Sequence, residues 1–444
     1  MLLYNLAIRF FVSCIKFAAL FNLKAQLWVK GRQNWRKRFA VVPFIVHRSS
    51  FKVLWLHAAS LGEFEQGRPI IEAFRTQFPN WKIVLTFFSP SGYEIRKDYP
   101  NADLVCYLPA DTSQNARDFL QIIQPDAAIF VKYEFWANYL FELKKRDIPT
   151  LLVAALFRPS QPFFKWYGGF WRKMLGCFSH IFVQNESSGK LLQSIDIQKF
   201  TLAGDTRVDR VLKIAEDAPE NGIVKAFVGA DSGQVLVVGS SWEADEAVII
   251  KGLQLSESFK LSGSLKLIIA PHEPSKGNVD RICKQVGNAV RYSRCLEVTP
   301  PRASEMSPPS STCLVIDNIG LLNTLYRYGT LAYIGGGFGK GIHNTLEPAA
   351  FGLPILFGPK YEKFEEAQQF VARGGAFPVR NAEEMAEILA KLQDPVFYKN
   401  ASHAVRSYLE ENRGATGMVM AYINKPPEVL KTSGGLSTNP QIAK

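Results

Sequence analysis

Two carboxylates stand where strand-like runs end in the first half of the chain. Glu63 follows the run that ends near His57, at a turn from strand to helix. Glu134 follows the run that begins at Ala127 and lies between aromatic residues in the sequence KYEFW. A carboxylate at such a turn can act as a general base. Each could instead be an acid near a helix N-terminus that offsets the helix dipole.

A cation, Arg207, accompanies these acids in the run GDTRVD. The chain should leave a first domain for a second at this point. A guanidinium there could face an anionic group in transfer, because it can hold a carboxylate with two hydrogen bonds. The alternative is a surface salt bridge.

A glycine-dense loop in the second half has the properties of an anion site. The apolar run 331–334 leads into the glycines, and the loop ends at Asn344, a residue type favoured at helix N-caps. Glu347 follows three places later, as in a capping box, and could bind a sugar hydroxyl. A strand, glycine loop and helix N-terminus present backbone N–H groups to a phosphate. Neither the Walker spacing nor the dinucleotide fingerprint is present, so the loop indicates an anionic ligand such as a nucleotide, or only a flexible turn.

Other polar side chains end strands of the second half. Pro271 and His272 end one of them, and Trp242 ends another. Both positions should face the glycine loop, because parallel sheets present ligands at the carboxyl ends of their strands. His272 could bind a base or a phosphate, or be structural. The sequence has no His-Glu-x-x-His motif and no Cys/His cluster, so we predict no metal site.

Strand-like apolar runs alternate with helical patterns, which predicts βαβ units and parallel sheets. The expected strands cover residues 51–56, 82–88, 103–108, 127–132, 150–154, 180–184, 234–239, 265–270, 313–316, 331–334 and 354–357. We therefore expect an α/β protein with two Rossmann-like, doubly wound domains that face a cleft.

The domain boundaries follow from changes in composition. We expect a membrane-anchor helix with a basic segment at residues 1–38 and an N-terminal domain at 39–206. A linker at 207–226 should lead to a C-terminal domain at 227–424, and residues 425–444 should form a disordered tail. The last helix of the C-terminal domain can pack back on the N-terminal domain. The Pro-rich stretch 299–312 is expected to be a surface loop.

The composition is globular: of 444 residues, 47% are hydrophobic and 21% are charged. Six cysteines form no Cys-x-x-Cys pair, which fits a reducing cytosol. The net charge of +12 is local, because ten basic residues precede Glu63, the first acidic residue. No nucleic-acid-binding motif accompanies them, so nucleic acid is not an expected partner.

The apolar N-terminal segment has a polar stripe of Asn5, Arg9, Ser13 and Lys16 at helical spacing. A spanning helix would bury two cations at a cost of about 2.5–3.5 kcal/mol each. A helix in the headgroup plane keeps both in water and lets the basic run 30–38 meet anionic lipid. We favour this interfacial anchor, at the cytoplasmic side of the inner membrane, over a single span or a soluble core helix.

A second candidate for membrane contact is the segment 157–173, which interleaves basic and aromatic residues. Such a mixture suits a membrane–water interface or a phosphorylated lipid. The alternative is an aromatic-rich core helix with a solvated basic face.

In this order, the motifs resemble those of the 3-deoxy-D-manno-octulosonic acid (Kdo) transferases, which act on lipid A precursors. The resemblance covers the chain to about residue 415. It rests on His57-x-x-Ser60-x-Gly-Glu63, Lys132-Tyr-Glu134-x-Trp136, Val183-Gln-Asn-Glu186, Gly204-x-x-Arg207-x-Asp209, Pro271-His272 and the loop from Gly335 to Glu347.

The resemblance implies a GT-B fold, in which the N-terminal domain binds the acceptor and the C-terminal domain binds CMP-Kdo. It implies that Glu63 is the catalytic base, acting with inversion, and that Glu134 and Arg207 stabilise the transition state. CMP-Kdo is then a donor substrate, and no cofactor is implied. The implied CMP contacts are Pro271, His272, Ile319, Gly320, Leu321, Asn344, Thr345, Leu346 and Glu347.

The chain departs from the family pattern at two places. Ile319-Gly320-Leu321 stands where the family usually has Met-Gly-Glu, so a carboxylate contact is lost or replaced. Lys360 stands where a histidine is common.

Two other functions stay open. The chain could be another GT-B transferase or an epimerase that uses a different nucleotide sugar. It could also be a non-enzymatic peripheral protein that binds lipid phosphate.

Overall fold

The structure is a computed structural model of the chain and describes residues 1–46, 51–229, 233–256, 265–297 and 311–425. It divides into two compact units, which are described one at a time. Unit 1 holds Met1–Asp209 and the segment from Arg413 onward, and unit 2 holds Arg210–Asn412.

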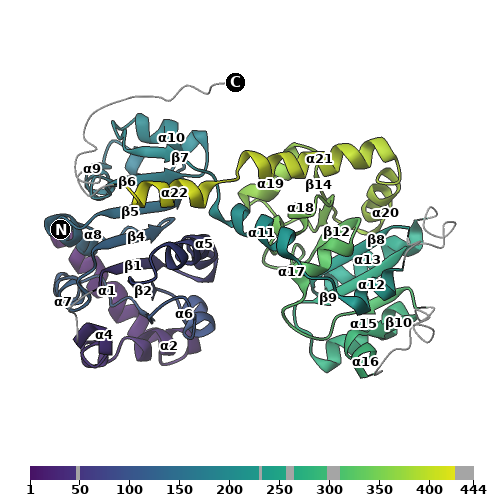
Figure 1. Cartoon of the computed structure of the whole chain (residues 1–444), viewed down its shortest axis with the longest axis horizontal. Helices are drawn as coiled ribbons and strands as arrows, with labels where there is room; N and C mark the ends of the chain where they lie inside the picture. The colour runs from purple at the N-terminus through teal and green to yellow at the C-terminus, as the bar shows by residue number, and fades with distance from the viewer. Residues whose placement is uncertain (47–50, 230–232, 257–264, 298–310, 426–444) are drawn as a thin grey trace. The chain divides into compact units, whose positions relative to one another are not determined.

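Unit 1 contains a seven-stranded parallel sheet in the order β3-β2-β1-β4-β5-β6-β7 (Figure 1). Its strands are β1 (Val53–Ala58), β2 (Lys82–Phe87), β3 (Leu104–Tyr107), β4 (Ala127–Val131), β5 (Thr150–Ala155), β6 (His180–Val183) and β7 (Phe200–Leu202). Its helices are α1 (Leu2–Ala18), α2 (Leu23–Gly31), α3 (Trp35–Phe39), α4 (Pro43–Val46), α5 (Leu61–Gln77), α6 (Pro90–Arg96), α7 (Ser113–Ile123), α8 (Ala137–Lys145), η1 (Pro162–Phe164), α9 (Gly169–Leu175), α10 (Glu186–Gln193) and α22 (Ala415–Ile423).

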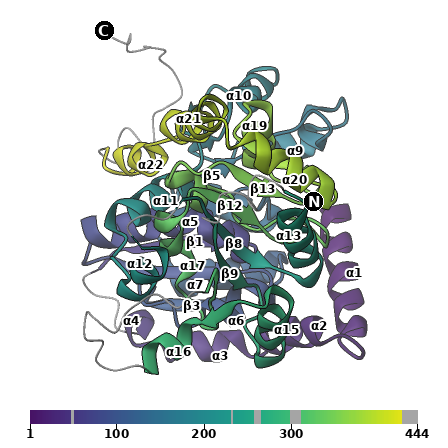
Figure 2. The same cartoon turned by 90° about the vertical axis from the view of Figure 1, so that its right-hand side faces the viewer.

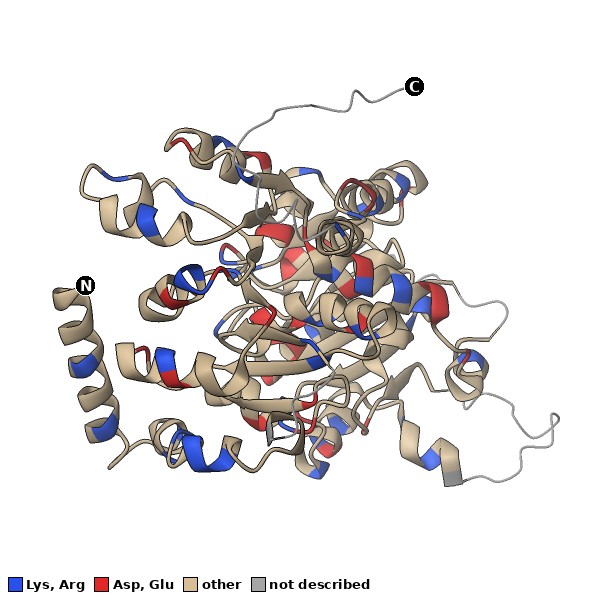
Figure 3. Ribbon diagram, turned by 60° about the vertical axis from the view of Figure 1, so that its left-hand side comes forward, with Lys and Arg blue, Asp and Glu red and all other residues tan. Residues whose placement is uncertain are grey.

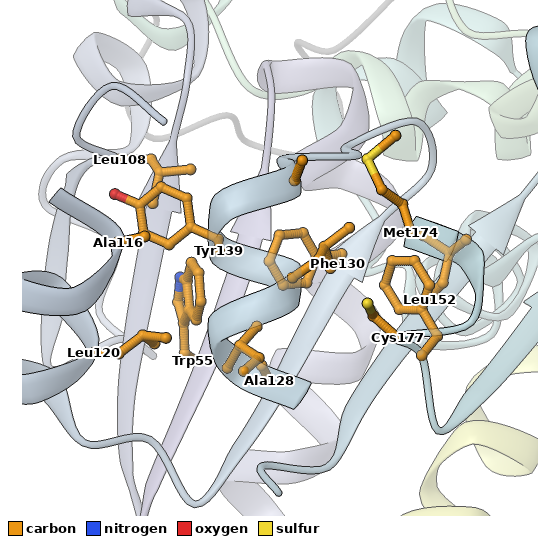
Figure 4. Close-up of a cluster of buried hydrophobic side chains, with 14 of the residues drawn as sticks. Trp55, Leu108, Ala116, Leu120, Ala128, Phe130, Tyr139, Leu152, Met174 and Cys177 are labelled. Carbon is orange, nitrogen blue, oxygen red and sulfur yellow. The ribbon is translucent and has the colours of Figure 1, made fainter. Parts of the chain in front are cut away.

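Strand β1 shows how this sheet is covered on both faces. All six of its residues are buried. Trp55 packs with Phe130 and Tyr139 in one hydrophobic cluster (Figure 4), whereas Leu54 and Leu56 belong to another. Neighbouring residues of a strand point to opposite faces, so both faces carry a core. This is why the strands are continuous apolar runs in the sequence.

Unit 2 contains a second seven-stranded parallel sheet, in the order β10-β11-β9-β8-β12-β13-β14. Its strands are β8 (Val235–Ser241), β9 (Lys266–Pro271), β10 (Ala289–Arg291), β11 (Cys313–Val315), β12 (Leu331–Ile334), β13 (Ile355–Phe357) and β14 (Ala376–Pro378). Its helices are α12 (Gly222–Val228), α13 (Glu243–Leu255), α15 (Lys276–Val286), α16 (Tyr292–Glu297), α17 (Leu322–Leu325), η2 (Tyr326–Tyr328), α18 (Leu346–Ala350), α19 (Glu365–Ala372), α20 (Ala382–Lys391) and α21 (Pro395–Glu411).

The stretch predicted as a linker, residues 207–226, is largely helical. Helix α11 (Thr206–Asp217) runs through the boundary between the units, and α12 begins at Gly222. Most charged residues of this stretch lie on these helices, where polar residues can cover the solvent face. The expected loop at 299–312 and the expected tail at 425–444 lie almost wholly outside the described residues.

Helix α22 belongs to the core of unit 1, although it follows unit 2 in the chain. Its side chains Val419 and Met420 are buried in the same cluster as Ile70 and Phe74 of α5. Figure 1 shows it in yellow, beside the strands of unit 1.

Helix α1 docks on unit 1 through polar and aromatic contacts and leaves other apolar side chains exposed. Tyr4 Oη donates to Asp111 Oδ2 at 2.6 Å, and Asn138 Nδ2 donates to Asn5 Oδ1 at 2.9 Å. Asn5 therefore faces the protein instead of joining a solvent-facing stripe. The helix runs along the side of the unit to α2 (Figure 2), and Phe10 on its outer face is 73% exposed. In the described part of the chain, no helix has both the length and the apolar character needed to cross a membrane.

Candidate active site

The two predicted carboxylates of unit 1 lie at the switch point of its sheet. Strands β1 and β4 are neighbours, and the chain order runs outward in opposite directions from this pair. Doubly wound sheets bind ligands outside the carboxyl ends of the strands at such a point. Glu63 follows β1 and Glu134 follows β4.

Glu63 is held at the start of α5. Ser60 is the N-cap residue of this helix, and its backbone is extended. Its hydroxyl donates to Glu63 Oε2 instead of capping a backbone N–H. The carboxylate thus lies on the first turn, where the helix dipole stabilises negative charge. The same position suits a base that faces a substrate and an acid that offsets the dipole.

Glu134 lies within a chain of hydrogen bonds that begins in the buried sheet. Trp55 Nε1 donates to Thr86 Oγ1 at 2.8 Å, and His57 Nδ1 lies 2.8 Å from the same oxygen and 3.2 Å from the Thr86 carbonyl oxygen. The other ring nitrogen, His57 Nε2, lies 3.0 Å from Glu134 Oε2. Trp136 Nε1 donates to this Glu134 oxygen at 2.7 Å. The side chains of His57 and Trp136 therefore hold the Glu134 carboxylate in place.

Arg207 is oriented by Asp205. Its Nε and Nη2 both donate to Asp205 Oδ2, at 2.9 Å and 2.6 Å, so the side edge of the guanidinium faces the carboxylate. Asp205 is 6% exposed. Burial raises the pKa of its carboxyl, but the charges of Arg207 and Lys132 and the hydrogen bonds from Arg207 outweigh burial and lower it below its usual value.

Two further interactions link the segment around Arg207 to the segments that carry Glu134 and Glu63. Lys132, directly after β4, acts electrostatically on Asp205 and adopts a left-handed backbone with φ 66°, which is costly for a residue with a side chain. Thr206 Oγ1 donates to the backbone carbonyl of Gln66, one turn after Glu63 in α5, at 2.5 Å. Unit 1 thus brings its three predicted catalytic residues to one edge of the sheet.

The glycine loop of unit 2 lies at the second switch point. Strands β8 and β12 are neighbours there, and the loop follows β12. A Cβ at Gly335 would lie 2.2 Å from the Ser240 carbonyl, and one at Gly337 would lie 2.5 Å from Gly358 Cα. Asp245 at the start of α13 accepts from the Gly336 N–H at 2.9 Å. The glycines therefore let this loop pack against neighbouring backbone, whatever ligand it binds.

His272 lies in the middle of an aromatic stack. Its ring lies 4.6 Å from that of Trp242 and 4.5 Å from that of His343, between centroids, with interplanar angles of 27° and 24°. Burial, together with the nearby His272, lowers the pKa of His343 to about 4. His343 is therefore neutral near pH 7. A flat stack of aromatic rings suits contact with a nucleobase.

The start of α18 differs from the predicted capping box. Thr345, not Asn344, is the N-cap residue, and it makes no side-chain cap bond. Asn344 Oδ1 instead accepts from the Leu346 N–H at 3.1 Å, and its Nδ2 donates to Glu347 at 3.0 Å. The side chains of Thr345 and Leu346 are fully buried. Side-chain contact with a ligand would therefore come from Asn344 and Glu347, the other two predicted residues of this group.

The remaining predicted CMP contacts also lie at carboxyl ends of strands in unit 2. Pro271 is the last residue of β9, next to His272. Ile319, Gly320 and Leu321 lie between β11 and α17, and Ile319 is 88% exposed. No group of three or more His, Cys, Asp or Glu side chains that could hold a metal occurs in the parts that the structure describes.

Three residues of these clusters received no role from the sequence. Thr86 is opposite His57 in the register of β1 and β2, which spacing along one strand cannot show. Asp205 stands in the motif that contains Arg207, and an acid two residues from a candidate cation was a usable signal. His343 joins the stack only because β8, β9 and β12 are neighbours.

Comparison with known proteins finds similarity to one family of transferases. The model of the family described as 3-Deoxy-D-manno-octulosonic-acid transferase (kdotransferase) matches residues 33–210. The chain is 27% identical over 343 residues to such a transferase from Aquifex aeolicus, covering 76% of this chain and 85% of that one. It is 25% identical over 375 residues to the transferase from Haemophilus influenzae, covering 82% and 84%.

A solved structure shares the fold at low sequence identity. The UDP-GlcNAc 2-epimerase of Neisseria meningitidis, bound to UDP-GlcNAc, superposes with a TM-score of 0.57 over 84% of this chain and 100% of that one, at 16% identity. With two doubly wound units and predicted site residues at both switch points, the chain has the GT-B fold. Its similarity to Kdo transferases, over residues 33–210 for the family model and over most of the chain for these relatives, indicates a glycosyltransferase.

Proposed function

We propose that this enzyme transfers Kdo from CMP-Kdo to a lipid A precursor of the lipid IVA type, with inversion at the anomeric carbon and without a metal ion. The observation that carries this assignment is the position of Glu63, on the first turn of α5 at the switch point of unit 1. Similarity to Kdo transferases supports the assignment of Kdo as the sugar that is transferred.

Glu63 takes the proton of the acceptor hydroxyl as that oxygen attacks the anomeric carbon. The bond from the sugar to the CMP phosphate breaks, and CMP leaves with the bonding electron pair. The transition state carries positive charge on the sugar ring and increasing negative charge on the phosphate. Glu134, fixed by His57 and Trp136, supplies negative charge, and Arg207, fixed by Asp205, supplies a rigid cation. Preoriented groups need no rearrangement as this charge develops.

Unit 2 supplies the donor site in this proposal. The stack of Trp242, His272 and His343 offers flat aromatic surfaces to the cytosine base. Asn344 and Glu347, whose side chains are joined by a hydrogen bond, are placed to contact the nucleotide beside the glycine loop. Backbone N–H groups of that loop would bind the phosphate.

The N-terminal helix would hold the enzyme at the cytoplasmic face of the inner membrane. The helix combines exposed apolar side chains with the cations Arg9 and Lys16, and its ribbon shows Lys and Arg positions but no acidic ones (Figure 3). Trp166 in the segment 157–173 is 91% exposed. Amphipathic surfaces of this kind lie in the headgroup region, where the lipid acceptor would be found.

Mass spectrometry of the products tests the function. Purified protein is incubated with CMP-Kdo and a lipid A precursor in the presence of EDTA, and we expect Kdo adducts of the precursor. Glu63→Gln should reduce the rate by about 100-fold or more, because general base catalysis contributes that much. The matched control is Glu65→Gln, on the same helix but paired with Arg96. Full transfer by Glu63→Gln would refute the base assignment, and transfer from UDP-sugars alone would refute the donor.

A further inference from the structure

A cavity of about 330 Å³ lies in unit 1 among the N-terminal helices, and none of its lining residues has a predicted catalytic role. Its walls come from α1, α2, α3, α7 and the loop that follows β3. The volume is at the lower end of the range of about 300–1,000 Å³ for small-molecule sites. The lining contains Lys16 and Arg32 and no acidic side chain. It is therefore electropositive.

Arg32 is a cation enclosed without a carboxylate partner. Its guanidinium donates to three backbone carbonyls, those of Leu108, Phe88 and Trp28, at 2.8, 2.7 and 3.1 Å. It also lies over the Trp28 ring, 3.8 Å from the centroid. Burial lowers its pKa to about 9, and the opposing effects of Tyr107, Tyr139 and Cys106 offset this only in part. The three bonds use only part of the five N–H groups of a guanidinium.

A second, independent donor in the same wall has no acceptor. Trp28 is 6% exposed, and no acceptor for its indole N–H exists in the described parts of the chain. A buried donor without a partner is costly, and such groups in native proteins usually mark a missing ligand or water. An anionic oxygen in the cavity would satisfy this N–H and neutralise Arg32.

The neighbouring surface indicates what carries this anion. Lys16, at the cavity, is on the last turn of α1, and Phe17 beside it is 68% exposed. Phe10, two turns earlier on the same helix, is 73% exposed. A free anion would not use this apolar surface, whereas the chains of a lipid would cover it.

We propose that this cavity binds the phosphate headgroup of an anionic phospholipid, with Lys16, Arg32 and the Trp28 N–H around the phosphate and the acyl chains along α1. The lipid would hold α1 against unit 1 at the membrane surface. This proposal does not depend on the donor or the acceptor assigned above, because none of the residues involved belongs to the sites at the switch points.

Calorimetric titration of the full-length protein in a non-ionic detergent tests the proposal. The probes are dihexanoyl phosphatidylglycerol, dihexanoyl phosphatidylcholine and inorganic phosphate, with both lipids below their micelle concentrations. We expect the first to bind more tightly than the other two. Lys16→Gln and Trp28→Phe should each weaken its binding by about tenfold, the worth of one hydrogen bond to a charged group.

The matched control is Lys24→Gln, an exposed lysine of α2 that does not line the cavity, which should bind as the parent does. Equal losses in Lys16→Gln and Lys24→Gln would show diffuse attraction and overturn the site. Equal binding of phosphatidylcholine would overturn anion selection, and equal binding of phosphate alone would overturn the lipid. Tighter binding of a lipid A precursor that displaces phosphatidylglycerol would make the cavity an acceptor subsite instead. If Trp28→Phe does not fold, the exposed Lys16→Gln still decides the outcome.

Discussion

Asp205 determines the geometry of Arg207. A free arginine side chain samples many conformations, but here two guanidinium nitrogens are bonded to one buried carboxylate. The arginine loses less conformational entropy per hydrogen bond when its planar guanidinium binds an acid that is itself held in place. The guanidinium of Arg207 is therefore held in a fixed plane. The sequence showed the cation and its motif, but its orientation depended on a partner that had no assigned role.

Asp205→Asn should lower kcat about tenfold or more while the KM for CMP-Kdo changes little, because the cation stays present but loses its fixed plane. The folded state should lose about 2 kcal/mol with the charged hydrogen bonds. Steady-state kinetics and urea unfolding measure the two effects. Asp118→Asn, which breaks the more exposed pair with Arg36, is the control and should change neither greatly. A destabilised Asp205→Asn enzyme with normal kcat would show that Arg207 is only structural.

His343 should make the stability of unit 2 depend on pH. Its pKa is lowered to about 4 in the folded chain, against 6.5 when unfolded. Between these values the unfolded state binds more protons, so stability should rise with pH from about 4 to 6.5. His343→Gln should reduce this slope in urea midpoints measured from pH 4.5 to 7.5. His403→Gln, at an exposed site on α21, should retain it. An unchanged slope in His343→Gln contradicts the prediction.

At the scale of elements, the extent to which a strand is buried determined whether it could be predicted from the sequence. The interior strands β1, β4 and β5 have helices on both faces and appear as apolar runs, so they were predicted within a few residues. The missed strands β7, β10 and β14 each have three residues and lie at sheet edges. An edge strand needs fewer apolar residues, so its pattern is too short to recognise. In the same way, the predicted site residues follow strands, whereas Thr86 depends on the register between two strands.

The glycine loop allows a test at this scale. Gly337→Ala would place a Cβ 2.5 Å from the backbone of Gly358, which directly follows β13. Either the glycine loop or the backbone at Gly358 must therefore move. We expect the free energy of unfolding to fall by about 1–3 kcal/mol, as is typical of overpacking, and CMP to bind more weakly. Gly339→Ala is the control, because its Cβ would meet only the Gly336 carbonyl at 3.4 Å. Thermal unfolding with and without CMP measures both effects. Equal stability of the two variants would show that the close approach is not needed.

At the scale of the whole molecule, the chain passes between the units twice. It crosses first within α11 and again between α21 and α22. Asp209 lies at the first crossing and accepts hydrogen bonds from the N–H groups of Gly414 and Thr416, at 2.6 and 2.7 Å. These bonds connect the first crossing segment to the second. Neither sheet has a strand from the other unit. Each unit should therefore unfold as its own cooperative body, with α22 contributing to unit 1 alone.

Val419→Asp tests this division. Val419 is fully buried in the core of unit 1, and an unpaired carboxylate there should cost about 3 kcal/mol or more. Calorimetry should show the transition of unit 1 at a lower temperature and that of unit 2 unmoved, although the substitution follows unit 2 in the chain. Val396→Asp, at a position of α21 that is 67% exposed, should move neither transition. If Val419→Asp lowered both transitions together, the two units would be one cooperative body, and α22 would be part of what couples them.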